Sequence, residues 1–277
     1  LMGTDKRNRQ KENRRARQSE LEKQNQRQKL VRRSTRIALL VGVVVAIVAA
    51  ISLWPESDSA TEPETTDTSV TETSETTIAP APAVPFEYGD GECAPTDGSG
   101  SQIQKFDAAP KLCIDPTKTY TALITTNKGE ITVVLDPTKA PGTVNNFVNL
   151  ARSKYFDNTV CHRAIPTFVV QCGDPTATGT GGPGYAISDE LPAAGEYKLG
   201  SLAMANSGPN TNGSQFFIIS GEQGIALPPS YSLFGQVTTG LDTTLPALDK
   251  AGNSDPASNG LPPKEEIRII SVTVSES

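Results

Sequence analysis

A small set of polar and aromatic side chains in the C-terminal half of the sequence has the types needed to bind a ligand. Its members are Arg163, Phe168, Gln171, Asn206, Gln215 and Phe217, each on or beside a β-rich run. Arg163 and Gln171 flank Pro166-Thr167, so a hairpin turning there would bring the two side chains together. Guanidinium and amide groups form hydrogen bonds, and aromatic rings enclose apolar groups. The set therefore indicates binding more than bond cleavage.

Each of these residues also has an ordinary structural explanation when it is taken alone. Phe168 and Phe217 are of the type most often found in a core, and an arginine such as Arg163 is most often a surface ion-pair partner. Gln215 could simply support a turn. Only their joint occurrence on neighbouring strands favours a binding site.

The sequence lacks the motifs of several other enzyme classes. It has no HExxH, GxSxG, CxxC or glycine-rich phosphate loop, so zinc protease, nucleotide-binding and thioredoxin-like functions have no support. His162 is the only histidine, and strand alternation places it on the opposite face from Arg163. We therefore expect His162 to be a core histidine whose ring nitrogens are hydrogen-bonded, not the general base of a hydrolase. We also expect no metal and no cofactor.

The elements that must position these residues are short strands and two helices. Asn127-Lys128-Gly129 separates two β-rich runs as a hairpin turn, with glycine supplying the positive φ. In the run 141–155, Val144, Phe147, Val148 and Ala151 follow the spacing of an amphipathic helix. A second helix is expected near 241–251. The predicted strands are 120–126, 130–135, 159–165, 168–172, 201–205, 215–219, 233–237 and 267–274.

Four sequence segments carry a resemblance to a known family. CHRAIPTFVVQCGD at 161–174, GTGGPGY at 179–185, SLAMANSGPNTNGSQFFI at 201–218 and YSLFGQV at 231–237 resemble the signature segments of cyclophilins, in order and in spacing. The resemblance covers roughly residues 118–277. It is in keeping with the fold class that the strand pattern predicts: mainly β, a closed eight-stranded antiparallel barrel capped by two helices, preceded by a transmembrane helix and a disordered linker.

The resemblance also implies roles for individual residues. Arg163 resembles the catalytic arginine of the family, beside the substrate proline, and Gln171 and Asn206 resemble the residues that hydrogen-bond the substrate backbone. Ala205 lines that groove and Gln215 supports the site. Phe168, Phe217 and Leu227 resemble the walls of the proline pocket.

Three positions depart from the family pattern at the pocket edge. Val169 stands where methionine is common, Tyr231 stands where the family has a histidine, and Ala226 stands where many eukaryotic members have tryptophan. Val169 should reshape one edge of the pocket, whereas Tyr231 still offers a hydroxyl group. The loss of tryptophan at Ala226 bears on cyclosporin binding more than on isomerisation.

Four cysteines favour disulfides in an exported domain, and four allow three pairings. Pairing of Cys93 with Cys113 would close an N-terminal arm. Cys161 and Cys172 stand where many cyclophilins have Phe and Gly, and their joint appearance favours a bond across the hairpin. If Arg163 and Gln171 share one face of the hairpin, however, Cys161 and Cys172 point to opposite faces, which opposes that bond unless a bulge intervenes.

The N-terminal third of the chain has an uneven charge distribution around one apolar run. Residues 1–36 carry a net charge of +9 while the whole chain carries −6, which leaves −15 on the rest. The run 37–54 is uncharged, ends at Trp54, and is just long enough to span a bilayer with its basic flank in the cytoplasm. A cleaved signal peptide is the main alternative, with Val48-Ala49-Ala50 as the cleavage site.

The sequence therefore predicts five parts: a basic cytoplasmic tail (1–36), a transmembrane helix (37–54), a disordered Thr/Ser/Glu/Pro-rich linker (55–85), an arm (86–117) and a cyclophilin-like domain (118–277). We expect a single-pass protein of the cell membrane, from a bacterium, with its domain outside the cytoplasm. We expect a monomer that binds proline-containing exported or unfolded polypeptides and no nucleic acid.

The resemblance implies a peptidyl-prolyl cis-trans isomerase that assists the folding of exported proteins. The alternative is a proline-peptide binding module or holdase that kept the fold and lost turnover. Retention of Arg163, Phe168, Gln171 and Phe217 favours the enzyme.

Overall fold

The computed structural model describes residues 86–277. The predicted tail (1–36), membrane span (37–54) and linker (55–85) lie outside the described residues. Within residues 86–277, every helix is too short or too polar to cross a bilayer.

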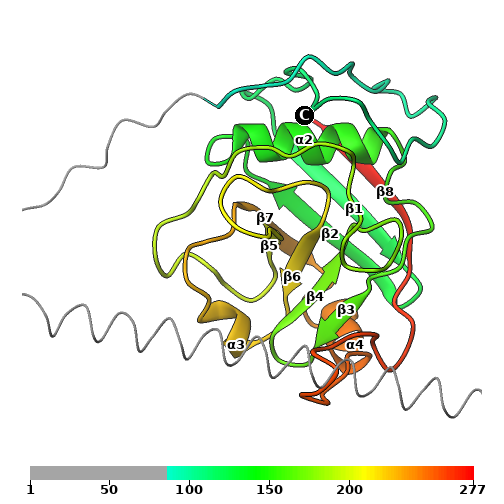
Figure 1. Cartoon of the computed structure of the whole chain (residues 1–277), viewed down its shortest axis with the longest axis vertical. Coiled ribbons are helices and arrows are strands. Elements are labelled where there is room, and N and C mark those ends of the chain that lie inside the picture. Colours follow the sequence, from blue (N-terminus) through cyan, green and yellow to red (C-terminus); the bar gives the residue numbers. More distant parts are fainter. Residues whose placement is uncertain (1–85) are drawn as a thin grey trace, which may run out of the picture. The chain divides into compact units, whose positions relative to one another are not determined.

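Eight antiparallel strands form one strongly curved sheet (Figure 1). Their order across the sheet is β3-β4-β6-β5-β7-β2-β1-β8, and the β1–β2 hairpin turns at Asn127 and Lys128, as predicted. The strands are β1 (Tyr120–Thr126), β2 (Gly129–Leu135), β3 (Arg163–Ile165), β4 (Val169–Cys172), β5 (Ser201–Met204), β6 (Phe216–Ile219), β7 (Leu233–Thr239) and β8 (Ile269–Glu276).

The two edges of the sheet, β3 and β8, meet through the segments beside them. Val160 pairs with Arg268 in an isolated bridge, the Cys161 N–H donates to the Ile267 carbonyl at 2.9 Å, and the Ile269 N–H donates to the Thr159 carbonyl at 2.9 Å. The predicted eight antiparallel strands are therefore confirmed, although β3 and β8 share no regular strand ladder within residues 86–277. The predicted strand 159–165 is reduced to Arg163–Ile165, since its first half makes only the bridge and the hydrogen bonds beside it.

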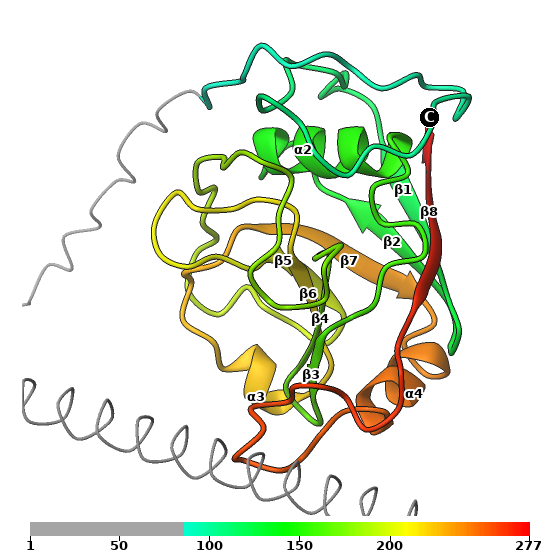
Figure 2. The ribbon, with the colours of Figure 1, turned by 45° about the vertical axis from the view of Figure 1, so that its right-hand side comes forward.

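Helix α2 (Pro141–Arg152) lies across one end of the curved sheet and α4 (Thr244–Lys250) lies at the other (Figures 1 and 2). The predicted apolar face of α2 is confirmed, with the Phe147 ring 5.5 Å from the Phe216 ring of the sheet. The carboxylate of Glu190 accepts hydrogen bonds from the first-turn amides of Gly142 and Thr143, which serves as the helix cap. α2 ends three residues before the predicted Tyr155, and a short helix α3 (Glu222–Ile225) was not predicted.

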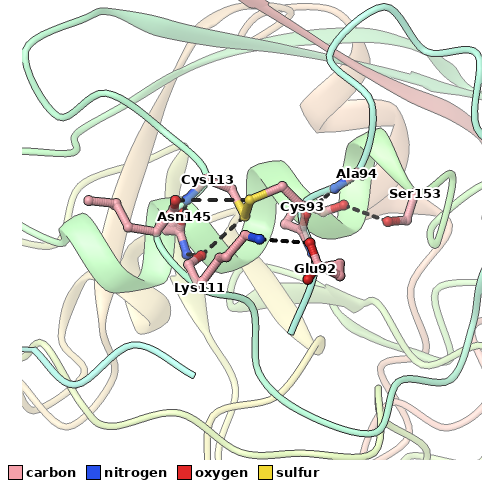
Figure 3. Close-up of a disulfide and its surroundings, with 9 residues drawn as sticks. Glu92, Cys93, Ala94, Lys111, Cys113, Asn145 and Ser153 are labelled. Carbon is pink, nitrogen blue, oxygen red and sulfur yellow. Dashed lines mark hydrogen bonds and ion pairs between the residues drawn. A yellow bond between two sulfur atoms is a disulfide. The ribbon is translucent and has the colours of Figure 1, made fainter. Parts of the chain in front are cut away.

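The arm, residues 86–117, runs over the outer side of α2 (Figure 2). The Cys93–Cys113 disulfide closes it, with 5.4 Å between the two Cα atoms, as predicted. Asn145 of α2 accepts from the Cys113 N–H and donates to the Lys111 carbonyl (Figure 3). The side-chain oxygen of Asn149 accepts from the Ala94 N–H at 2.8 Å. The polar side of α2 can therefore be buried because the arm backbone satisfies its amides.

Strand alternation divides the buried apolar residues into two clusters. On β6, Phe216 and Ile218 belong to the main core beneath α2, whereas Phe217 and Ile219 belong to a second cluster on the opposite face of the sheet. Val169 of β4 and Ala203 of β5 join that second cluster. This outer cluster is the floor of the site described next.

Candidate peptide-binding site

Nine of the ten residues that the sequence assigned to the site line one small cleft of about 180 Å³ on the outer face of the sheet. The tenth, Gln215, lies behind Gln171 and lines the neighbouring groove. The residues of the cleft are Arg163, Phe168, Val169, Gln171, Ala205, Asn206, Phe217, Leu227 and Tyr231. The structure thus brings the predicted residues together, while their individual roles stay predictions.

Arg163 lies on β3 directly opposite Gln171 of β4, and its guanidinium is held on two sides. Nη1 donates to the Gln171 side-chain oxygen at 3.2 Å. Nε donates to the Asn259 carbonyl at 3.0 Å and Nη2 to the Asn259 side-chain oxygen at 3.2 Å. A guanidinium has five N–H groups, so one on each terminal nitrogen remains free for a ligand.

Burial lowers the pKa of Arg163 from its usual value, and Tyr231 partly opposes that effect. An arginine nevertheless keeps its proton in proteins. Cζ of Arg163 also lies 5.7 Å from the ring centroid of Phe168. The cleft therefore contains a half-buried positive charge beside apolar walls, where its hydrogen bonds are stronger than in water.

A chain of amide hydrogen bonds fixes the orientation of Gln171. Its side-chain N–H donates to the Gln215 oxygen at 2.9 Å. The Gln215 amide in turn donates to the carbonyls of Gly179 and Gly181, at 3.1 Å and 2.9 Å. The Gln171 oxygen must then face Arg163, which leaves one N–H of Gln171 free for a ligand.

The glycine loop that ends this chain is fixed by the fully buried Asp174. Its carboxylate accepts from the amides of Thr176, Gly179 and Gly181. Burial alone would raise the pKa of Asp174, but these hydrogen bonds outweigh burial and hold the pKa below its usual value. The glycine loop that supports Gln215 is therefore held in place by an ionised carboxylate.

The apolar wall of the cleft is a set of packed rings. The Tyr231 ring stands edge-on to the Phe217 ring, with 5.3 Å between centroids. The hydroxyl of Tyr197 donates to the Tyr231 carbonyl at 2.7 Å and accepts from its N–H at 3.1 Å. Burial raises the pKa of Tyr197 to about 12, so this hydroxyl stays protonated. The small volume and apolar lining suit a compact ring such as that of proline.

Asn206 presents its backbone to a ligand more readily than its side chain. The side-chain N–H donates to the Ser230 carbonyl at 2.9 Å, and the side-chain oxygen accepts from the Gly208 N–H at 3.3 Å. Within residues 86–277, its backbone N–H and carbonyl have no intramolecular partner. The predicted contact with a peptide backbone is therefore assigned to these main-chain groups.

The Cys161–Cys172 disulfide is formed beside Arg163 and Gln171, with 4.0 Å between Cα atoms. Strand parity does not prevent it, because Cys161 precedes the regular β3–β4 ladder. His162 is buried, as predicted, at 4% exposure. Its Nδ1 has no hydrogen-bond partner in the described part of the chain, so the expectation of a satisfied histidine is wrong.

Sequence reasoning missed Asn259 and Tyr197, the two residues that hold Arg163 and Tyr231 from outside the recognised segments. Asn259 is 96 positions from Arg163 in the chain. Its only local signal is the Asn259-Gly260 dipeptide, which marks a turn without showing what the turn contacts.

Comparison with known proteins points to one family. Residues 121–274 match the model described as Cyclophilin type peptidyl-prolyl cis-trans isomerase/CLD. The chain is 38% identical over 193 residues to a probable peptidyl-prolyl cis-trans isomerase B of Mycobacterium leprae, with 64% of each protein covered. It is 40% identical over 183 residues to the protein of the same name from Mycobacterium tuberculosis, covering 61% of this chain and 58% of the relative. The chain thus spans less than two thirds of the length of these relatives.

Solved structures agree with that match. A crystal structure of a Cryptosporidium parvum cyclophilin type peptidyl-prolyl cis-trans isomerase is similar with a TM-score of 0.51 and 34% identity, covering 57% of this chain and 99% of that one. A second crystal structure of the same protein, in the presence of the dipeptide Ala-Pro, has a TM-score of 0.50.

Proposed function

This chain belongs to the family of cyclophilin-type peptidyl-prolyl cis-trans isomerases, and on that premise we propose that it accelerates isomerisation of Xaa-Pro bonds through the cleft at Arg163. The observation that carries the proposal is the half-buried guanidinium with free N–H groups at the edge of a small apolar cleft. The reaction makes and breaks no covalent bond, which suits a site without a nucleophile.

The barrier to isomerisation comes chiefly from amide resonance and amounts to ~18–20 kcal/mol. Resonance is lost in the twisted state, and the lone pair localises on the prolyl nitrogen. A free N–H of Arg163 can donate to that nitrogen only when the bond is twisted. The donor therefore stabilises the transition state more than either planar isomer, which is the requirement for catalysis.

Rotation also requires one side of the peptide to be held while the other turns. Phe168, Phe217 and Leu227 would hold the proline ring in the cleft. The free N–H of Gln171 and the unpaired backbone groups of Asn206 would hold the substrate main chain. Since Gln215 and the glycine loop fix Gln171 beforehand, little ordering is needed at the moment of reaction.

The activity is tested with the full chain, its disulfides formed and a mild detergent present. Cis-to-trans exchange of an Ala-Pro peptide is measured by NMR at substoichiometric protein, for the parent and for Arg163→Ala. We expect acceleration by the parent and loss of most of it in the variant. Arg268→Ala, which removes an arginine that bonds Glu266 and Asn158 and does not line the cleft, should stay close to the parent.

Binding of the peptide without acceleration by the parent would replace the enzyme with the alternative, a proline-peptide binding module or holdase. Equal activity of Arg163→Ala and the parent would remove Arg163 from its proposed role.

We propose further that residues 37–54 anchor the protein in the cell membrane, with residues 1–36 in the cytoplasm and the domain outside. The charge asymmetry around the run supports this topology. Two disulfides, with no free cysteine among the described residues, suit an oxidising compartment. The substrates would then be exported polypeptides as they fold.

The topology is tested by labelling introduced cysteines in whole bacterial cells with a membrane-impermeant maleimide. Ser59→Cys should react in intact cells, and Ser19→Cys should react only after permeabilisation. The four native cysteines should not react with the maleimide, because they form disulfides. Labelling in the reverse order would exclude the proposed orientation, and loss of the Ser19→Cys site from the mature protein would indicate a cleaved leader.

We propose that the protein acts as a monomer. Sedimentation of the full chain in detergent tests this, and activity confined to a dimeric species would contradict it.

A further inference from the structure

We propose that Asn259 is a positioning residue for Arg163, and that the loop carrying it, residues 253–262, is part of the isomerase machinery. The inference rests on the proposed function and adds to it a residue outside the recognised segments.

Asn259 makes most of the hydrogen bonds that hold the Arg163 guanidinium within the described residues. Asn259 accepts two of the three intramolecular hydrogen bonds of the guanidinium, one at its carbonyl (3.0 Å) and one at its side-chain oxygen (3.2 Å). These bonds occupy Nε and Nη2, while Gln171 occupies Nη1. Acceptors on both sides fix the plane of the guanidinium, so its remaining N–H groups point in a set direction.

The loop that carries Asn259 is fixed to β3, the strand that carries Arg163. The Ala164 N–H donates to the Gly260 carbonyl at 3.1 Å, and the Ala164 carbonyl accepts from the Asn253 N–H at 2.9 Å. A Cβ at Gly260 would lie 2.5 Å from the Ile165 side chain, so only glycine allows this approach. Gly260, the neighbour of Asn259 in the chain, is thus bonded to Ala164, the neighbour of Arg163, and this keeps Asn259 close to the guanidinium.

Asparagine is well suited to position 259 by its backbone conformation and by its side-chain oxygen. Asn259 has a φ of +50°, in the left-handed region that asparagine, aspartate and glycine tolerate best. Glycine lacks a side-chain acceptor, and aspartate would neutralise the guanidinium. Asparagine therefore combines this conformation with a neutral acceptor, which leaves the positive charge available to the prolyl nitrogen.

The test compares Asn259→Gly with Asn158→Gly in the full chain. Both positions have a left-handed backbone, with φ of +50° and +59°, so glycine should fit each. Asn259→Gly removes only the side-chain oxygen that faces Arg163. We expect its kcat/KM to fall about 3- to 10-fold, as for loss of one ordinary hydrogen bond, because the carbonyl of residue 259 still accepts from Nε of Arg163. The loss should lie in kcat, with KM changed less than about twofold, because the free N–H groups act in the twisted state.

A second readout follows the guanidinium itself. Rotation about the Nε–Cζ bond of Arg163 is measured by NMR of arginine-labelled protein, with the signal assigned by its loss in Arg163→Lys. We expect rotation to quicken in Asn259→Gly, to match the parent in Asn158→Gly, and to slow again in Asn259→Asp, which restores a side-chain acceptor.

The proposal is overturned if Asn259→Gly keeps the parent rotation rate, or if its kcat falls no more than that of Asn158→Gly. If the parent itself fails to accelerate exchange, the proposed function fails. The rotation rates then decide whether Asn259 orders Arg163, independently of that failure.

Discussion

Arg163 and Gln171 lie directly opposite each other on β3 and β4, and Nη1 of the arginine donates to the glutamine oxygen at 3.2 Å. Gln171 also donates to Gln215, whose amide donates to the glycine loop, so two amides in series connect the cation of the cleft to that loop. The hairpin therefore supplies the charge and its support together. The importance of this pair can be tested by removing the amide and leaving the cation.

We expect Gln171→Ala to lower kcat/KM about 10-fold, because the variant loses both the support for Arg163 and a donor to the substrate backbone. The measurement is NMR exchange of an Ala-Pro peptide. Gln223→Ala serves as the matched control, since Gln223 bonds to Thr167 outside the cleft. Equal losses in the two variants would show that the effect is not specific to the cleft.

His162 should make the protein less stable in weak acid. Burial lowers its pKa in the folded state, and the positive charge of Arg163 acts in the same direction, although Asp174 opposes them. The unfolded chain, with a pKa of about 6.5, therefore binds the proton first as the pH falls. Folding stability should decline as the pH drops below about 6.5, until the folded-state pKa is reached.

This expectation is checked by urea unfolding between pH 7.5 and pH 5. The decline over this range should be smaller in His162→Gln than in the parent. A free energy of unfolding that rises in the parent as the pH falls toward 5 would contradict the assignment to His162.

The two disulfides should differ in their resistance to reduction. Cys93 is exposed, whereas Cys161 and Cys172 are 1% and 2% exposed. A thiolate must reach a sulfur atom to exchange with it, so access limits the rate. We expect a mild thiol reductant to open Cys93–Cys113 first, as followed by alkylation and peptide mass spectrometry. Simultaneous loss of both bonds would show that reduction proceeds through global unfolding.

The arm should contribute to stability through Phe106. Its ring lies 6.3 Å from the Tyr155 ring and 6.1 Å from the Tyr185 ring, and its N–H donates to the Pro183 carbonyl at 2.7 Å. We expect Phe106→Ala to cost about 2 kcal/mol, below the range for a fully buried phenylalanine because this ring is partly exposed. Urea unfolding measures the change.

Ile103→Ala is the control for Phe106→Ala, because Ile103 lies on the same arm with 43% of its surface exposed. A loss in Ile103→Ala as large as that in Phe106→Ala would mean that the arm is held by its backbone and its disulfide rather than by this ring.

Much of the site could be predicted because local sequence carries it. The segment 161–174 contains both strands of a tight hairpin, so Arg163 and Gln171 meet whatever the rest of the chain does. The same holds for the apolar stripe of α2. The run FFII at 216–219 is different, because all four residues are buried and the pattern alone does not show which of them face the cleft; the resemblance implied Phe217, and the structure places Phe217 at the cleft and Phe216 in the core.

The sequence by itself determined the antiparallel β class and the helix that covers the sheet, because these depend on residue types at short spacings, and the resemblance of four segments to cyclophilins implied the residues of the cleft. Only the tertiary structure decided that the seam closes around the bridge between Val160 and Arg268, and that Asn259 reaches Arg163. Both contacts join segments roughly 100 residues apart, and local propensity says nothing about where such distant segments meet. Chain path and packing fix them, since long-range contacts form only after the intervening loops have closed.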